Sequence, residues 1–112
     1  MALFSPPLKV TIIAPGHSPK VNTHWKYAVR ATRGGKLVAA KITAQIVDPV
    51  GGHHAVEFGN SKKTITNWPF KGEFRDFIIW PPESRGFPLR LRVIVAAGGT
   101  KRTVDYPVTP RA

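Results

Sequence analysis

Basic side chains at alternate positions of apolar runs are the feature of this sequence best suited to chemistry. Arg90 and Arg92 alternate with leucine and valine, and Lys41, Lys101 and Arg102 lie in two further apolar runs. Guanidinium groups bind phosphate or carboxylate through paired hydrogen bonds, and ammonium groups attract the same anions as point charges. If these runs are neighbouring strands, Lys41, Arg90, Arg92 and Lys101 form one anion-binding face, with Arg102 at its edge.

The overall charge supports the same chemistry. Lysine and arginine together number 17 against 6 acidic residues, which gives a formal net charge of +11. Such a field concentrates polyanions near the protein, and the candidates are nucleic acid, anionic lipid and acidic wall polymer. The alternative is that the charge serves solubility and protects strand edges from pairing. No aromatic residue is interleaved with the basic positions, which argues against sequence-specific binding of nucleic acid.

Two aromatic–proline segments form a second candidate site. Trp68 and Phe70 flank Pro69, and Trp80 precedes two prolines. Prolines would hold flat rings in place for a sugar or peptide ligand at low entropic cost. The alternative is that a tryptophan plugs the end of a small β-domain. Solvent exposure distinguishes the two interpretations, because a plug is buried and a binding platform is exposed to solvent.

Catalytic and metal chemistry find little support. The chain has no cysteine, and its serines are not accompanied by a histidine and an acidic residue in the order of a catalytic triad. We therefore do not expect the protein to be an enzyme. Asp76 shares a predicted strand face with Phe74 and Ile78, so if that face is buried its carboxylate needs a partner. His53 and His54 are neighbours that would point to opposite faces of a strand. We therefore expect no metal site and no cofactor.

The elements that must position these side chains are β-strands. Residues 25–49 predict two strands joined by a tight hairpin at Gly34-Gly35, because glycine permits the positive φ angles of such turns. Apolar side chains alternate with polar ones in both, so each strand has a buried and a wet face. The apolar sets are Trp25, Tyr27, Val29 and Ala31 in the first strand, and Val38, Ala40, Ile42, Ala44 and Ile46 in the second.

Further strands are predicted at residues 8–13, 54–58, 73–80, 89–97 and 100–108, with a short edge strand at 63–66 and a loop at 67–72. The 11 prolines and 10 glycines punctuate the chain throughout, and no helical period appears. Roughly seven or eight short strands at regular spacing are typical of an all-β antiparallel sandwich. The length predicts one domain over residues 1–112, with an ordered core at about 8–108.

The order of these strands resembles a known architecture. The segment from Gly34 to Thr43, GGKLVAAKIT, is similar to a "Gly-Lys-Pro-Val-x-Gly-Ala-x-Val" hairpin of bacterial immunoglobulin-like and fibronectin type III-like modules. The run GFPLRLRV and the later VDYPV resemble the last two strands of such modules. Leu37 replaces the usual proline, and alanine replaces the usual glycine. The resemblance implies an immunoglobulin-like β-sandwich in which the third, sixth and seventh strands lie side by side.

Such modules are usually extracytoplasmic and non-catalytic, and they bind or space in envelope or secreted proteins. The resemblance therefore implies an extracellular or envelope location, as a mature fragment, since the first residues show no signal peptide. No apolar run is long enough to cross a bilayer. We expect a binding or spacer module whose partner is an anionic polymer or a protein. The alternatives are a carbohydrate- or peptide-binding domain that uses the aromatic segments, and a nucleic-acid-binding β-domain.

Overall fold

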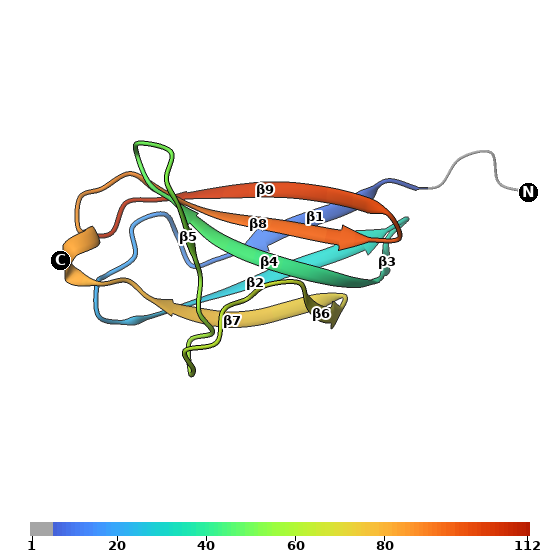
Figure 1. Cartoon of the computed structure of the whole chain (residues 1–112), viewed down its shortest axis with the longest axis horizontal. Coiled ribbons are helices and arrows are strands. Elements are labelled where there is room, and N and C mark those ends of the chain that lie inside the picture. The colour runs from blue at the N-terminus through green and yellow to red at the C-terminus, as the bar shows by residue number, and fades with distance from the viewer. Residues whose placement is uncertain (1–5) are drawn as a thin grey trace, which may run out of the picture.

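The computed structural model describes residues 6–112 of the chain, which form nine strands and a single 3-10 turn at Pro82–Ser84. All strand pairs in its two sheets are antiparallel (Figure 1). The strands are β1 (Leu8–Ile13), β2 (His24–Arg33), β3 (Lys36–Leu37), β4 (Ala39–Val47), β5 (His53–Ala55), β6 (Trp68–Lys71), β7 (Glu73–Ile79), β8 (Leu89–Ala97) and β9 (Thr100–Val108). The predicted all-β antiparallel sandwich is confirmed.

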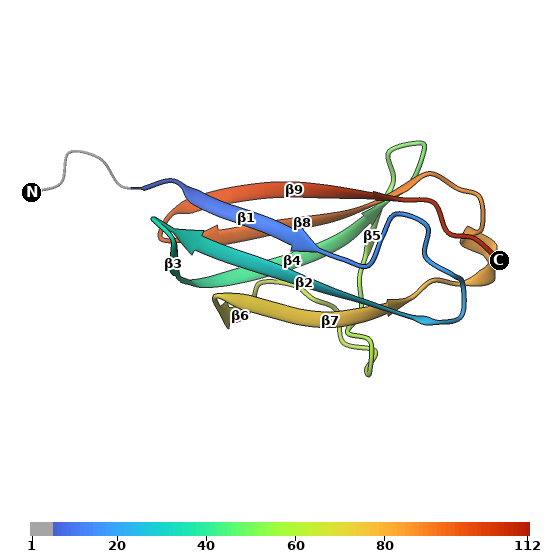
Figure 2. The same ribbon diagram turned by 180° about the vertical axis from the view of Figure 1, so that it is seen from behind.

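The two sheets differ in their order of strands. In the first sheet β2 is central and pairs with β1, β7 and the short β3. In the second sheet β4 and β8 are central, β9 is one edge, and β5 and β6 pair with successive parts of β4. The second sheet lies in front in Figure 1, and the first sheet lies in front in Figure 2. The third strand of the sequence prediction thus pairs with the second-to-last strand, β8, which in turn pairs with the last strand, β9.

The hairpin predicted at Gly34-Gly35 forms, but it is much shorter than predicted. The turn forms, with φ angles of 61° and 78°, but only two residue pairs join β2 to β3 across it. The chain then leaves the first sheet at Val38, whose amide still donates to the Ala31 carbonyl, and β4 joins the second sheet. Alternation fixes which face of a strand is buried, but it does not fix the sheet that the strand joins.

Two smaller elements also differ from the prediction. Residues 67–72, expected as a loop, contain β6, in which Trp68 lies opposite Ile42 of β4. Pro69 is tolerated there because β6 is an edge strand, where a missing amide costs no ladder bond. The expected edge strand at 63–66 is reduced to a single bridge between Thr64 and Glu57.

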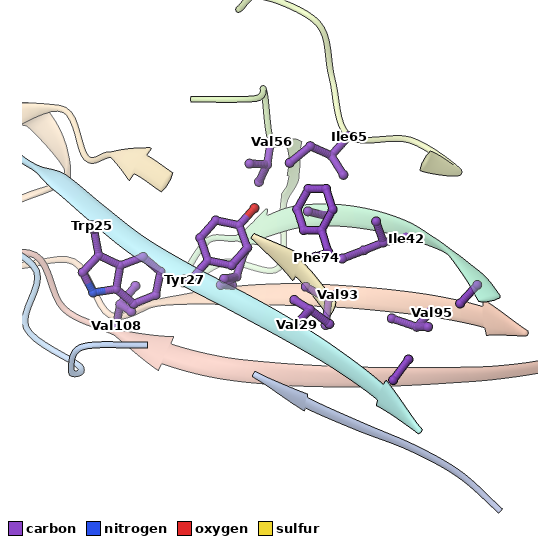
Figure 3. Packing of buried hydrophobic residues seen from close by; sticks show 14 of the residues in the cluster. Trp25, Tyr27, Val29, Ile42, Val56, Ile65, Phe74, Val93, Val95 and Val108 are labelled. Carbon is purple, nitrogen blue, oxygen red and sulfur yellow. The ribbon is translucent and has the colours of Figure 1, made fainter. Parts of the chain in front are cut away.

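One hydrophobic core fills the space between the sheets. The inward side chains of β2, including Trp25, Tyr27 and Val29, meet Ile42 of β4 and Val93 of β8 (Figure 3). Burial of each large apolar side chain contributes about 1.5–3 kcal/mol to stability. Burial confirms the alternation predicted for β2, β8 and residues 40–44 of β4, so the polar residues between them point to the two outer faces. At the end of β4, Val47 is buried whereas Ile46 is only partly buried.

Candidate anion-binding face

The outer face of the second sheet gathers the basic side chains that the sequence predicted. Lys41 of β4 lies opposite Ala96 of β8, which lies opposite Lys101 of β9. Residues directly opposite in a ladder point to the same side, and neighbouring strands are about 4.8 Å apart. The backbones at Lys41 and Lys101 are therefore about 10 Å apart, with only the small side chain of Ala96 between them.

The two arginines of β8 share one carboxylate. Arg92 donates to Asp105 of β9 from Nε at 2.8 Å and from Nη2 at 3.0 Å, and Arg90 lies 3.5 Å from the same carboxylate. The hydrogen bonds from Arg92 lower the pKa of Asp105, and the charges of Arg92 and Arg90 add to that effect. Asp105 offsets half of the charge of these two arginines, and it holds Arg92 in a bidentate ion pair with Arg90 beside it.

Lys71 belongs to the face although the sequence pattern did not point to it. Lys71 is the last residue of β6 and lies opposite Ala39, two residues before Lys41 on β4. Its position was predicted as loop, and only the pairing of β6 with β4 reveals it. Lys41, Lys71 and Lys101 are all exposed, and no carboxylate within residues 6–112 pairs with them. We call these three residues the lysine cluster.

Arg102 does not point to this face. It lies opposite Val95, whose side chain is fully buried, so it lies on the inward side of β9 at the edge of the sheet. Its Nε donates to the Leu8 carbonyl of β1 at 3.2 Å. Arg102 thus bridges the two sheets where their edges meet, and it holds them together instead of extending the anion-binding face.

The aromatic candidate residues separate into a plug and an edge cluster. Trp80 is only 2% exposed and meets Trp25 edge-on at 5.6 Å, so it is a core plug and not a platform. Trp68 is 36% exposed, but its ring packs edge-on against Phe58 and beneath the Lys63 ammonium. Phe70 packs against Phe74 in the same edge cluster. The three candidate residues do not form one ligand-binding surface.

The acidic and histidine side chains serve local structure. Asp76 accepts hydrogen bonds from the Gly59 amide at 3.1 and 3.2 Å, which supplies the partner that its position required. Asp48 anchors a turn through the amides of Val50 and Gly52. A hydrogen bond from His54, followed by one from the Gly52 amide, lowers the pKa of Asp48. Burial, then the charge of Asp76, raises the pKa of Tyr27 above its ordinary value.

No group of three or more histidine or acidic side chains within the described residues could hold a metal ion. The same part of the chain has no helix of the length and apolarity needed to cross a membrane.

Comparison with known proteins adds little. No family model matches this chain, and no curated protein matches it. A crystal structure of a DUF4466 family protein from Parabacteroides merdae is similar over 94% of this chain and 44% of that chain, with 16% identity and a TM-score of 0.49. This chain thus spans less than half the length of that protein. The function has to be argued from the surface itself.

Proposed function

We propose that the chain is a non-catalytic binding module that engages anionic polymers through the lysine cluster. The observation that supports this proposal is the exposure of three ammonium groups, from β4, β6 and β9, around the small residues Ala39 and Ala96. Small residues leave room for a polymer to approach, and ammonium groups that neutralise its phosphate, sulfate or carboxylate groups release the cations condensed on the polymer. The arginines differ because Asp105 already occupies them.

The architecture suggests where such a module would act. The confirmed sandwich is compatible with the immunoglobulin-like and fibronectin type III-like modules that the strand order resembles, and we propose membership of that architectural class. In that class the module would sit in an extracellular or envelope protein, and acidic polymers of the cell surface are the partners that the charge of +11 would meet there.

Salt-dependent binding to defined polyanions tests the proposal. Affinity for polyphosphate, polyglutamate and single-stranded DNA would be measured across NaCl concentrations for the native chain and a K41A/K71A/K101A variant. We expect the slope of log K against log salt to fall by roughly two to three when three contacts are lost.

The matched control is a K9A/K26A/K62A variant, which loses the same charge from exposed positions elsewhere. This control variant should keep most of the slope of log K against log salt. Equal losses in the two variants would show that net charge alone acts and would overturn the assignment to the lysine cluster. Preference for DNA at equal charge density would favour the nucleic-acid alternative.

A further inference from the structure

The outer face of the first sheet, which lies toward the viewer in Figure 2, is hollowed by a shallow trough of about 710 Å³. Strand pairing places Ile13 of β1, Ala28 of β2 and Arg75 of β7 in one row across this face. Lys26 and Phe77 form the next row. Neighbouring strands are about 4.8 Å apart, so the backbones at Ile13 and Arg75 are about 10 Å apart. The small side chain of Ala28 lies between them and forms the floor of the trough.

The walls of the trough are apolar, and one of them is held in place by its neighbours. Ile13 is 49% exposed, and Pro15 continues the same wall where the chain leaves β1. In the opposite wall the ring of Phe77 stacks on the ring of His24, with 4.1 Å between the centroids. Gly59 packs so closely against the Phe77 ring that a Cβ there would lie 2.6 Å from it. An apolar ligand would therefore meet a preformed surface, which lowers the entropic cost of binding.

Within residues 6–112, the trough is lined by a single positive charge that has no acidic partner. Arg75 donates to Glu73 from Nε at 2.6 Å, so these two lining residues offset each other's charge. Asp76 lies opposite Tyr27, whose side chain is buried, so its carboxylate points away from the trough. Lys26 is exposed, and no carboxylate of the described residues forms an ion pair with it. A ligand that suits the trough thus combines an apolar body with one negative charge.

The charges around the trough argue against a second copy of the chain as its occupant. Lys9, Lys26 and Arg30 share the outer face of the first sheet. Glu73 is the only acidic residue that β1, β2 and β7 present on this face, and Arg75 already engages it. Two copies packed face to face would bring like charges together, which costs free energy.

We propose that the trough binds a small amphipathic monoanion, in which one carboxylate or sulfonate is attached to an aryl or alkyl body. The apolar body lies over Ala28, between Ile13 and Phe77, and the negative group meets the ammonium of Lys26. Burial of apolar surface supplies most of the affinity, because an exposed ion pair adds little in water. The ammonium group selects anions over ligands that carry a positive charge.

The probes are anilinonaphthalene sulfonate, whose fluorescence rises in apolar surroundings, and its neutral counterpart N-phenyl-naphthylamine. We expect the full chain to bind the sulfonate at one site, with the largest changes in amide chemical shift at Ala28, Ile13 and Phe77. Ala28→Leu fills the trough, so it should weaken the binding of both probes by about tenfold or more. Thr32→Leu is the matched control, since Thr32 points from the same strand to the same face but does not line the trough. Full affinity in Ala28→Leu, or shifts that avoid the trough, would overturn the proposal.

Two further variants test the charge. Lys26→Ala should weaken binding of the sulfonate by about twofold to fivefold, since an exposed ion pair is weak, and should leave binding of the neutral probe unchanged. Lys9→Ala is the matched control, because Lys9 is an exposed lysine of the same face outside the trough. If Lys26→Ala and Lys9→Ala act alike, or if Lys26→Ala affects both probes alike, the anion does not meet Lys26 and the proposal is wrong.

Self-association is the remaining outcome. If the chain alone forms dimers that Ala28→Leu abolishes, the occupant of the trough is a second copy and the proposed ligand is wrong. The trough and the lysine cluster can fail independently. The K41A/K71A/K101A variant should bind the sulfonate as the native chain does, and Ala28→Leu should keep the native salt dependence of polyanion binding.

Discussion

At the scale of single residues, Asp105 decides which cations of the basic face are available. Its carboxylate binds Arg92 through two hydrogen bonds and forms a longer ion pair with Arg90, whereas no carboxylate within residues 6–112 pairs with the lysine cluster. The sequence pattern predicted that these residues share a face, because alternation is a local property. It did not predict the pairing, because the register of β8 against β9 sets which side chains meet.

We expect Asp105→Asn to strengthen polyanion binding and to weaken the fold. Neutral asparagine cannot hold two guanidinium groups, so Arg90 and Arg92 become free to bind anions. The slope of log K against log salt should steepen by roughly one for each new contact. Thermal melting at pH 7 should drop by a few degrees, since a charge-assisted pair is lost. Unchanged binding would show that the arginines cannot reach the polymer even when they are released.

The pH dependence of stability is the control for the Asp105→Asn prediction. Hydrogen bonds from Arg92 lower the folded pKa of Asp105, so its contribution to stability is complete above the unfolded pKa of about 3.9. That contribution disappears as the pH falls through the lower folded value. The difference in melting temperature between the native chain and Asp105→Asn should be constant from neutral pH to about pH 4 and should shrink below it. A difference that persists in strong acid would point to a cause other than this carboxylate.

At the scale of elements, the crossing from β3 to β4 shows what local patterns can predict. The turn at Gly34-Gly35 and the alternation of the flanking strands could be predicted from the sequence, and both are present. The change of sheet at Val38 depends on contacts with Gly72, far along the chain, whose amide donates to the Val38 carbonyl. The position of Lys71 is hidden for the same reason. Long-range pairing of this kind leaves no periodic signal in a single sequence.

Gly72 should therefore be more sensitive to substitution than its turn geometry alone implies. A Cβ at this position would lie 2.8 Å from the Leu37 Cβ, and the φ angle of 76° also disfavours side chains. We expect Gly72→Ala to reduce the free energy of unfolding by about 1–3 kcal/mol, measured by chemical denaturation. Gly51→Ala is the matched control, because Gly51 has a φ of 87° and open space around it. If the two variants lose equal stability, the contact with Leu37 contributes nothing.

At the scale of the whole molecule, the excess of positive charge opposes the compact state. The chain has a net charge of +11, and the four ion pairs within residues 6–112 involve no lysine, so the lysines repel one another. We expect the melting temperature to rise as NaCl is increased from low ionic strength to about 0.15 M, where the Debye length is about 8 Å. The melting temperature of the K41A/K71A/K101A variant should rise less with added NaCl. A fall in melting temperature with salt would mean that the ion pairs outweigh the repulsion.

The bond from Arg102 to Leu8 has a mechanical consequence. It ties β9 to β1 where the two strands lie side by side, while the start of β1 and the C-terminus lie toward opposite ends of the long axis (Figures 1 and 2). A pulling force between those ends would run along the strands, so the backbone hydrogen bonds across the six residue pairs of β1 and β2 would be loaded together in shear. Simultaneous loading resists rupture better than unzipping one rung at a time. We therefore expect the fold to resist a force along its long axis better than a force across it.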